Sequence, residues 1–222
     1  MKTLLAGLLV ICGLQFAKAE EAVPVEQKIV ELHITLKAKP EAEAKYRKKT
    51  QNLPQVEAGH AVCSGAFVSN MGDIITAGHC TEEAAEIEVV TYDRRTYTAV
   101  IVATSAIHDL ALIHIDRRET AAFQAAPVIT RGEKVFILGS PLAITDALST
   151  GIVAKLDGDL LMLDCSALPG NSGSPVFDND GNMVGVLTAV AIAGFGLTHL
   201  SIAQNLDAVF FFLARAAAHI RQ

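Results

Sequence analysis

The sequence predicts an all-β fold that ends in one α-helix. Two observations favour this class: short apolar or alternating runs recur along the chain, and turn-forming residues separate them. The runs fall into two sets, divided by a polar stretch at residues 116–120. With 222 residues, of which 51% are hydrophobic and 19% charged, the chain is long and apolar enough to build a globular core.

The first set of runs predicts a β-unit at about residues 56–118. Its strands are expected at residues 62–69, 73–76, 87–91, 96–103 and 110–115. The second set predicts another β-unit at about residues 134–204. Its strands are expected at residues 135–138, 149–156, 160–163, 175–177, 183–189 and 196–202, with hairpin turns at 157–158 and 179–182.

Residues 205–220 have the periodicity of an amphipathic helix that closes the chain. Asn205 is a suitable N-cap for it. One face carries the apolar side chains expected to dock on the second unit, namely Leu206, Val209, Phe210, Leu213 and Ile220. Phe211 and Phe212 are expected partly off that face. A wider buried stripe is the favoured interpretation of this pair, and a contact for a partner or a membrane is the alternative.

The first 19 residues (1–19) have the features of a signal peptide. Lys2 gives a positive start, residues 4–14 are apolar, and Ala17 and Ala19 occupy the small-residue positions before a cleavage site. We therefore expect export, to the periplasm or the medium, with no stable membrane insertion after cleavage. An uncleaved membrane anchor is the alternative, although this apolar stretch is shorter than the roughly 20 residues that span a bilayer.

Residues 20–55 form an N-terminal arm of undecided role. Val30, Leu32, Ile34 and Leu36 alternate with polar residues, as in a half-buried strand. A propeptide, a regulatory arm and an extra edge strand all remain open.

Three short segments, far apart in the sequence, each contain one residue of a nucleophilic triad. They lie at residues 76–80, 108–113 and 170–175. A serine hydroxyl is a weak nucleophile at its ordinary pKa, so an imidazole must take its proton, and a carboxylate must hold that imidazole. His79, Asp109 and Ser172 are the candidate base, orienting acid and nucleophile. The backbone N–H groups of Gly170 and Ser172 are the candidate oxyanion hole, because a glycine there lets both amides converge.

These three segments resemble the chymotrypsin-like superfamily of serine proteases. Pro-Gly-Asn-Ser at residues 169–172 and Leu-Gly-Ser-Pro at 138–141 are more similar to its HtrA/Deg branch. The resemblance covers about residues 56–204, so the protease domain is expected at 56–222. It implies two perpendicular six-stranded antiparallel β-barrels, with His79 and Asp109 on the first and Ser172 on the second. We expect no PDZ domain, since about 18 residues follow the last predicted strand.

The resemblance also implies a specificity pocket. Its walls are expected at Ser166, Thr188, Val190 and Gly196, where no charged residue falls. Val190 should shorten the pocket, which predicts cleavage after small or medium apolar residues. In digestive members of the superfamily an acidic residue precedes the serine and pairs with a new N-terminal amine. Asn171 is neutral, so that mode of activation is not expected here.

The cysteine spacing predicts one disulfide. Cys63 and Cys80 flank a strand, a turn and a strand, so the ends of this hairpin should meet beside His79. The superfamily often has a bridge at this place. Cys165 is then unpaired, and we expect a buried apolar residue rather than a reactive thiol.

Composition excludes other functions. The net charge is −6 and no basic run occurs, which argues against nucleic-acid binding. The remaining histidines lack the spacing of a metal site, so we expect neither metal nor cofactor. The predicted function is a serine endopeptidase acting on proteins or peptides, with oligomerisation open. The alternatives are a latent, chaperone-like binding module on the same fold, and an esterase that reuses the triad.

Overall fold

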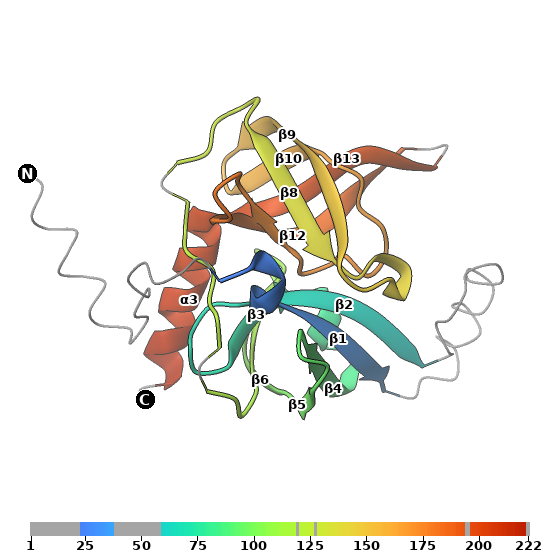
Figure 1. Cartoon of the computed structure of the whole chain (residues 1–222), viewed down its shortest axis with the longest axis vertical. Helices are drawn as coiled ribbons and strands as arrows, with labels where there is room; N and C mark the ends of the chain where they lie inside the picture. Colours follow the sequence, from blue (N-terminus) through green and yellow to red (C-terminus); the bar gives the residue numbers. More distant parts are fainter. Residues whose placement is uncertain (1–22, 38–58, 119, 127, 194–195, 221–222) are drawn as a thin grey trace, which may run out of the picture.

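Two β-structures stacked on one another make up the molecule, and a C-terminal helix lies along one side of both (Figure 1). The computed structural model describes residues 23–37, 59–118, 120–126, 128–193 and 196–220. The predicted signal peptide at residues 1–19 lies outside the described residues, as do residues 20–22 and 38–55 of the arm. Among the described helices, none is both long enough and apolar enough to cross a membrane.

The first half is a seven-stranded antiparallel sheet. Its strands are β1 (Ile29–Leu36), β2 (His60–Phe67), β3 (Asp73–Ala77), β4 (Ala84–Thr91), β5 (Thr96–Thr98), β6 (Val100–Ser105) and β7 (Leu110–His114). They pair in the order β5-β4-β1-β2-β3-β7-β6. The expected fold class is confirmed, but the expected closed barrel of six strands was wrong for this half, which is a curled half-barrel of seven described strands. The run at residues 96–103 divides into β5 and β6, and β1 adds a further strand.

β1 gives part of the N-terminal arm a structural role. The predicted strand is confirmed, and Val30, Leu32 and Ile34 are buried in the core of the first half. The predicted alternation is only partly right, because Ile29 and Glu31 are buried too. The strand pairs with β2 on one side and β4 on the other, so it lies inside the sheet and not at an edge. A short 3₁₀ helix, η2 (Val25–Lys28), leads into it. The first half of the fold therefore begins well before residue 56.

The second half is a closed barrel of six strands, as expected. The strands are β8 (Lys134–Gly139), β9 (Ala147–Asp157), β10 (Leu160–Asp164), β11 (Pro175–Phe177), β12 (Met183–Ala193) and β13 (Gly196–Asn205), closed in the order β10-β13-β12-β11-β8-β9. Both predicted hairpin turns are present. Gly158 has a φ of 59° between β9 and β10, and the Asp178 carboxylate accepts hydrogen bonds from the N–H groups of Asp180 and Asn182 before β12.

The helix α3 (Leu206–Ile220) holds the two halves together. The side chain of Asn205 caps it by accepting a hydrogen bond from the Ala208 N–H at 3.0 Å. Its apolar side chains share one cluster with residues of both β-halves. The predicted buried face was wrong at one position: Phe210 is 39% exposed and Phe212 only 4%, whereas Phe211 is 55% exposed. The side chain of Ile220 lies outside the described residues.

Candidate active site

The strand register of the first half brings His79 and Asp109 together. β3 ends at Ala77 and pairs with β7 so that Ala77 faces Leu110. His79 begins the short helix α2 (His79–Glu82) just after β3, and Asp109 stands just before β7. Two residues thirty positions apart in sequence thus become neighbours at one end of the sheet.

Asp109 holds His79 by two hydrogen bonds. Its Oδ2 lies 2.8 Å from Nδ1 of the His79 ring, and its Oδ1 accepts the backbone N–H of His79 at 2.8 Å. Its own carbonyl accepts the Gly78 N–H at 2.8 Å. Asp109 has a φ of 49°, a left-handed conformation that aspartate tolerates better than most residues. These bonds fix the ring with Nδ1 toward Asp109, so that Nε2 is left for other partners.

The carboxylate also sets the charge behaviour of His79. Its hydrogen bond is the largest influence and raises the pKa of the His79 imidazole above its ordinary value, while partial burial opposes this and the charges of Asp109 and Glu82 add to it. The side chain of His79 is 43% exposed and that of Asp109 is 34% exposed. Asp109 is therefore less buried than the orienting carboxylate of a triad usually is.

Ser172 lies in a tight turn of the second half. The turn is held by hydrogen bonds from the Asn171 N–H to the Leu168 carbonyl at 3.0 Å and from the Gly173 N–H to the Leu187 carbonyl at 2.7 Å. Gly173 has a φ of 84°, and a Cβ there would come within 2.1 Å of the Ser64 carbonyl oxygen. Only glycine fits at position 173. Ser172 itself is half-buried.

The backbone of Ser172 contacts the first half beside His79. Its carbonyl accepts the Ser64 N–H at 2.8 Å and lies 3.9 Å from Sγ of Cys80, the residue after His79. The structure therefore brings all three predicted triad residues to the junction of the two halves. Within the described part of the chain, no hydrogen bond joins the Ser172 hydroxyl to the His79 ring.

Gly170, the predicted oxyanion donor, has a left-handed backbone conformation. Its φ is 105°, and a Cβ would lie 2.2 Å from the Ser140 carbonyl oxygen, so a larger residue does not fit. The preceding carbonyl, of Pro169, accepts the Leu142 N–H at 2.7 Å. Because the C=O and N–H of a trans peptide point in opposite directions, the Gly170 N–H points away from Leu142.

The predicted disulfide is confirmed. Cys63 and Cys80 are bonded, and their Cα atoms are 6.4 Å apart. Both sulfurs and the His79 ring lie close enough together to resemble a metal-binding group. Disulfide sulfurs are not thiolates, however, so this group has the chemistry of a crosslink and not of a metal centre.

The predicted pocket residues lie on β12, at the start of β13 and just after β10, and the pocket that they would form stays a prediction. Thr188 is buried and stands at a β-bulge, where the pairing of β12 with β13 shifts between Leu187 and Ala189. Val190 is half-buried and Ser166 is exposed. Gly196 pairs with Ala193 at the start of β13, and its surroundings lie outside what the structure describes.

Cys165 behaves as the sequence predicted. It is a buried free cysteine, and burial, aided by the charge of Asp164, raises the pKa of its thiol to about 11. A thiol of this kind stays protonated at neutral pH.

Ser64 lies at the candidate site and was not predicted from the sequence. It lies on β2, is fully buried, and its hydroxyl contacts both the Gly170 loop and Ser140. The signal available was weak: a hydroxyl residue inside the apolar run at 62–69, next to Cys63.

The profile of the trypsin-like peptidase domain matches residues 63–186, more than half of the chain. The chain belongs to the trypsin-like peptidase family. The match begins at Cys63 and includes all three predicted triad residues.

Several relatives of this chain are named DegP-like. A probable periplasmic serine endoprotease DegP-like of Pseudomonas putida is 30% identical over 154 residues, which cover 65% of this chain and 32% of the relative. Protein y4bJ of Sinorhizobium fredii, an uncharacterized protein, is 33% identical over 172 residues, covering 71% and 27%. The chain thus spans about a third of the length of these curated relatives.

Solved structures of trypsin-like peptidases share the fold. The HtrA-type protease AlgW with a tripeptide superposes with a TM-score of 0.73 at 21% identity, over 87% of this chain and 61% of that one. A serine endoprotease from Yersinia pestis gives a TM-score of 0.71 at 19% identity, over 90% and 68%. The predicted resemblance to the HtrA/Deg branch is confirmed.

Proposed function

We propose that this protein is a serine endopeptidase that works through Ser172, His79 and Asp109. The observation that carries the proposal is the pair of hydrogen bonds that the Asp109 carboxylate accepts from His79, at the junction where the turn of Ser172 contacts the first half. Membership of the trypsin-like peptidase family and DegP-like relatives support it.

The proposed reaction passes through an acyl-enzyme. The Ser172 hydroxyl attacks the peptide carbonyl while Nε2 of His79 takes its proton, and Asp109 stabilises the imidazolium that forms. The N–H groups of Gly170 and Ser172 stabilise the oxyanion. The C–N bond breaks as the imidazolium gives its proton to the leaving amine. A water, deprotonated by His79, then attacks the ester. The C–O bond to Ser172 breaks, the acid product leaves, and the imidazolium returns its proton to the Ser172 oxygen.

We propose cleavage after small or medium apolar residues. Ser166, Thr188 and Val190 are uncharged, and Val190 is branched where a glycine would leave a deeper space. One neighbouring structure holds a tripeptide, which supports peptides as the substrate class.

Export is part of the proposal. DegP-like relatives are named as periplasmic, and the Cys63–Cys80 disulfide suits an oxidising compartment.

Labelling with a fluorophosphonate tests the proposed function. We expect the purified protein to become labelled at one site, and Ser172→Ala to remain unlabelled. Cut sites mapped in an unfolded protein should then lie after residues such as Ala and Val. Absence of labelling in the wild type, together with binding of unfolded protein, would favour the latent binding module. Cuts dominated by Arg, Lys or Glu before the bond would overturn the proposed specificity.

A further inference from the structure

Ser64 lies where the first half meets the candidate oxyanion loop. Along β2, Cys63 faces the core of the first half, so Ser64 faces the other way, toward the second half. Its residue surface is fully buried. A buried hydroxyl must find partners, and those of Ser64 come from the other half of the molecule.

The Ser64 hydroxyl joins two loops of the second half. It donates a hydrogen bond to the Gly170 carbonyl at 2.9 Å and accepts one from the Ser140 N–H at 3.0 Å. The backbone N–H of the same residue donates to the Ser172 carbonyl at 2.8 Å. One residue of the first half thus holds the carbonyls of both residues whose N–H groups form the proposed oxyanion hole.

These contacts close a ring of hydrogen bonds around Gly170. Ser140 begins the loop that contains η3 (Pro141–Ala143), and within that loop the Leu142 N–H holds the Pro169 carbonyl. The peptide group before Gly170 is therefore fixed by Leu142, and the peptide group after it by Ser64. Gly170 has no Cβ to restrict its backbone, so the direction of its N–H group depends on these two contacts.

We propose that Ser64 is a positioning residue that aims the N–H groups of Gly170 and Ser172 at the oxyanion. This proposal rests on the proposed function. Ser64 touches no reacting atom; it acts through the loop that it holds. Pre-aligned donors matter because a displacement of about 1 Å in such a site costs roughly 10²-fold in rate.

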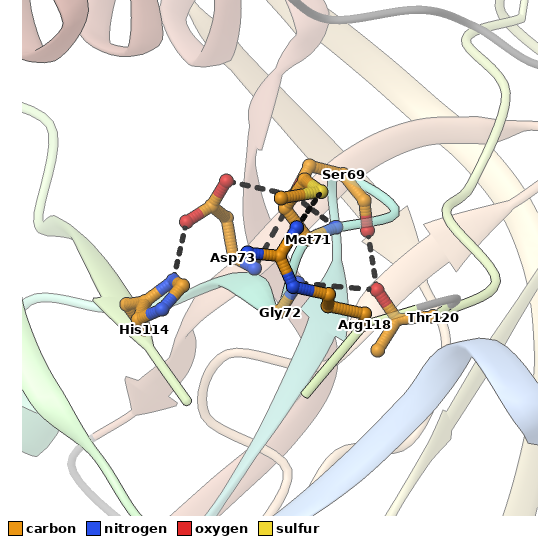
Figure 2. A network of polar contacts seen from close by, with 7 residues as sticks. All are labelled: Ser69, Met71, Gly72, Asp73, His114, Arg118 and Thr120. Carbon is orange, nitrogen blue, oxygen red and sulfur yellow. Dashed lines mark hydrogen bonds and ion pairs between the residues drawn. The ribbon is translucent and has the colours of Figure 1, made fainter. Parts of the chain in front are cut away.

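The chain contains a matched control for this hydroxyl. Thr120 is also buried, and its hydroxyl likewise bridges a carbonyl and an amide: it donates to the Ser69 carbonyl at 2.7 Å and accepts the Gly72 N–H at 3.3 Å. Figure 2 shows this network at the turn between β2 and β3. His79 follows the other end of β3, so Thr120 has the same type of bonding far from the candidate site.

Steady-state kinetics of Ser64→Ala and Thr120→Val test the proposal. For Ser64→Ala we expect kcat to fall about 10–100-fold with KM within about twofold, since the missing contact acts in the transition state. Affinity for a peptide boronate should fall by the same factor, and the pH midpoint of kcat/KM should not move. Ser64→Thr, which retains the hydroxyl, should restore most of the rate. Thr120→Val should keep kcat within about twofold, whatever its thermal midpoint.

Unchanged kcat in Ser64→Ala, or an equal loss in Thr120→Val, would overturn the proposal. Hydrogen exchange tests the positioning role of Ser64 separately from the proposed function. Ser64→Ala should speed exchange at residues 138–142 and 168–174, and unaltered exchange there would refute the positioning role even in an inactive enzyme. If Ser64→Ala does not fold, hydrogen exchange is measured in the wild type instead. On binding the boronate, exchange at residues 138–142 and 168–174 must slow, whereas exchange at residues 70–72 must not. If a fluorophosphonate never labels the wild-type protein, this result disproves the proposed function but not the positioning role of Ser64.

Discussion

Asp109 organises one end of the first sheet with three hydrogen bonds. Its carboxylate holds the ring and the backbone of His79, and its carbonyl holds Gly78. The sequence motif predicted the pairing of these side chains. It did not predict the left-handed φ of Asp109 or its partial exposure, because both depend on the loop before β7 and on how the halves pack around it.

Replacing Asp109 by asparagine should shift the pH profile downward. The hydrogen bond to Asp109 raises the pKa of His79, so its loss lowers that pKa, and the base becomes neutral at a lower pH. The rising limb of kcat/KM should move to lower pH, while kcat falls by about 10⁴-fold. The pair also stabilises the fold in a way that depends on pH. Because folding raises the pKa of His79, this stabilisation is fully present below the pKa of His79 in the unfolded chain, and it is lost as the pH rises through the pKa in the folded protein. A profile of Asp109→Asn that rises at the wild-type pH would contradict this account.

Cys165 should resist alkylation in the folded protein. Burial raises its pKa to about 11, so almost no thiolate is present at pH 8. Iodoacetamide followed by mass spectrometry should leave Cys165 unmodified in buffer and modify it in denaturant. Rapid modification of the native protein would show that the second half opens far more readily than its packed core indicates.

At the scale of whole elements, patterns that depend on local periodicity were predicted well. The six strands of the second barrel, both hairpin turns and the helix cap all follow from runs and turn residues. The place of β1 between β2 and β4 was not predictable, because alternation reveals a half-buried strand but not its neighbours. Similarly, periodicity could not choose between Phe210 and Phe212 on α3, since the docking angle of the helix decides which of them is covered.

Two adjacent phenylalanines on α3 should differ sharply in their effect on stability. Phe212 is 4% exposed and belongs to the cluster that joins both halves, so Phe212→Ala should lower the free energy of unfolding by about 3–5 kcal/mol. Phe211 is 55% exposed and contacts the His108 ring and Arg215, so Phe211→Ala should cost about 1 kcal/mol or less. Urea unfolding of both variants measures this, and similar losses would refute the packing described for α3.

The disulfide stabilises the hairpin that leads to His79. Cys63 and Cys80 are separated by 17 positions, and a crosslink closing such a loop contributes roughly 3 kcal/mol in the chain-entropy model. The double variant Cys63→Ala, Cys80→Ala should lose about that amount in urea unfolding. If wild type treated with reductant matches the double variant, the loss belongs to the crosslink; a loss seen only in the variant belongs to the side chains.

On the scale of the molecule, the two β-halves share a core. One apolar cluster contains Ile75 and Leu112 from the first half, Val186 from the second, and Val209 and Phe212 from α3. The sequence predicted two units joined by a polar stretch, but contacts between them come from tertiary packing and cannot be derived from local pattern. Ser64 belongs to the same class of feature, because its partners lie more than seventy residues away.

We therefore expect the halves to unfold together. The chain has no tryptophan, and its three tyrosines all lie in the first half of the sequence, so tyrosine fluorescence reports mainly on the first half. Far-UV circular dichroism reports on both. The two signals should give coincident urea transitions with one midpoint. Separate midpoints would mean that the shared cluster contributes little to cooperativity.

The segment between β7 and β8, which connects the two halves, offers a practical use of this arrangement. Arg131, Gly132 and Glu133 are exposed between the two halves, and a Cβ added at Gly132 would meet no neighbouring atom. A chain divided near this point would leave the proposed nucleophile, Ser172, on one fragment and the proposed base, His79, on the other. Hydrolysis would then return only when both pieces reassociate, which would make the divided protein a sensor of fragment complementation.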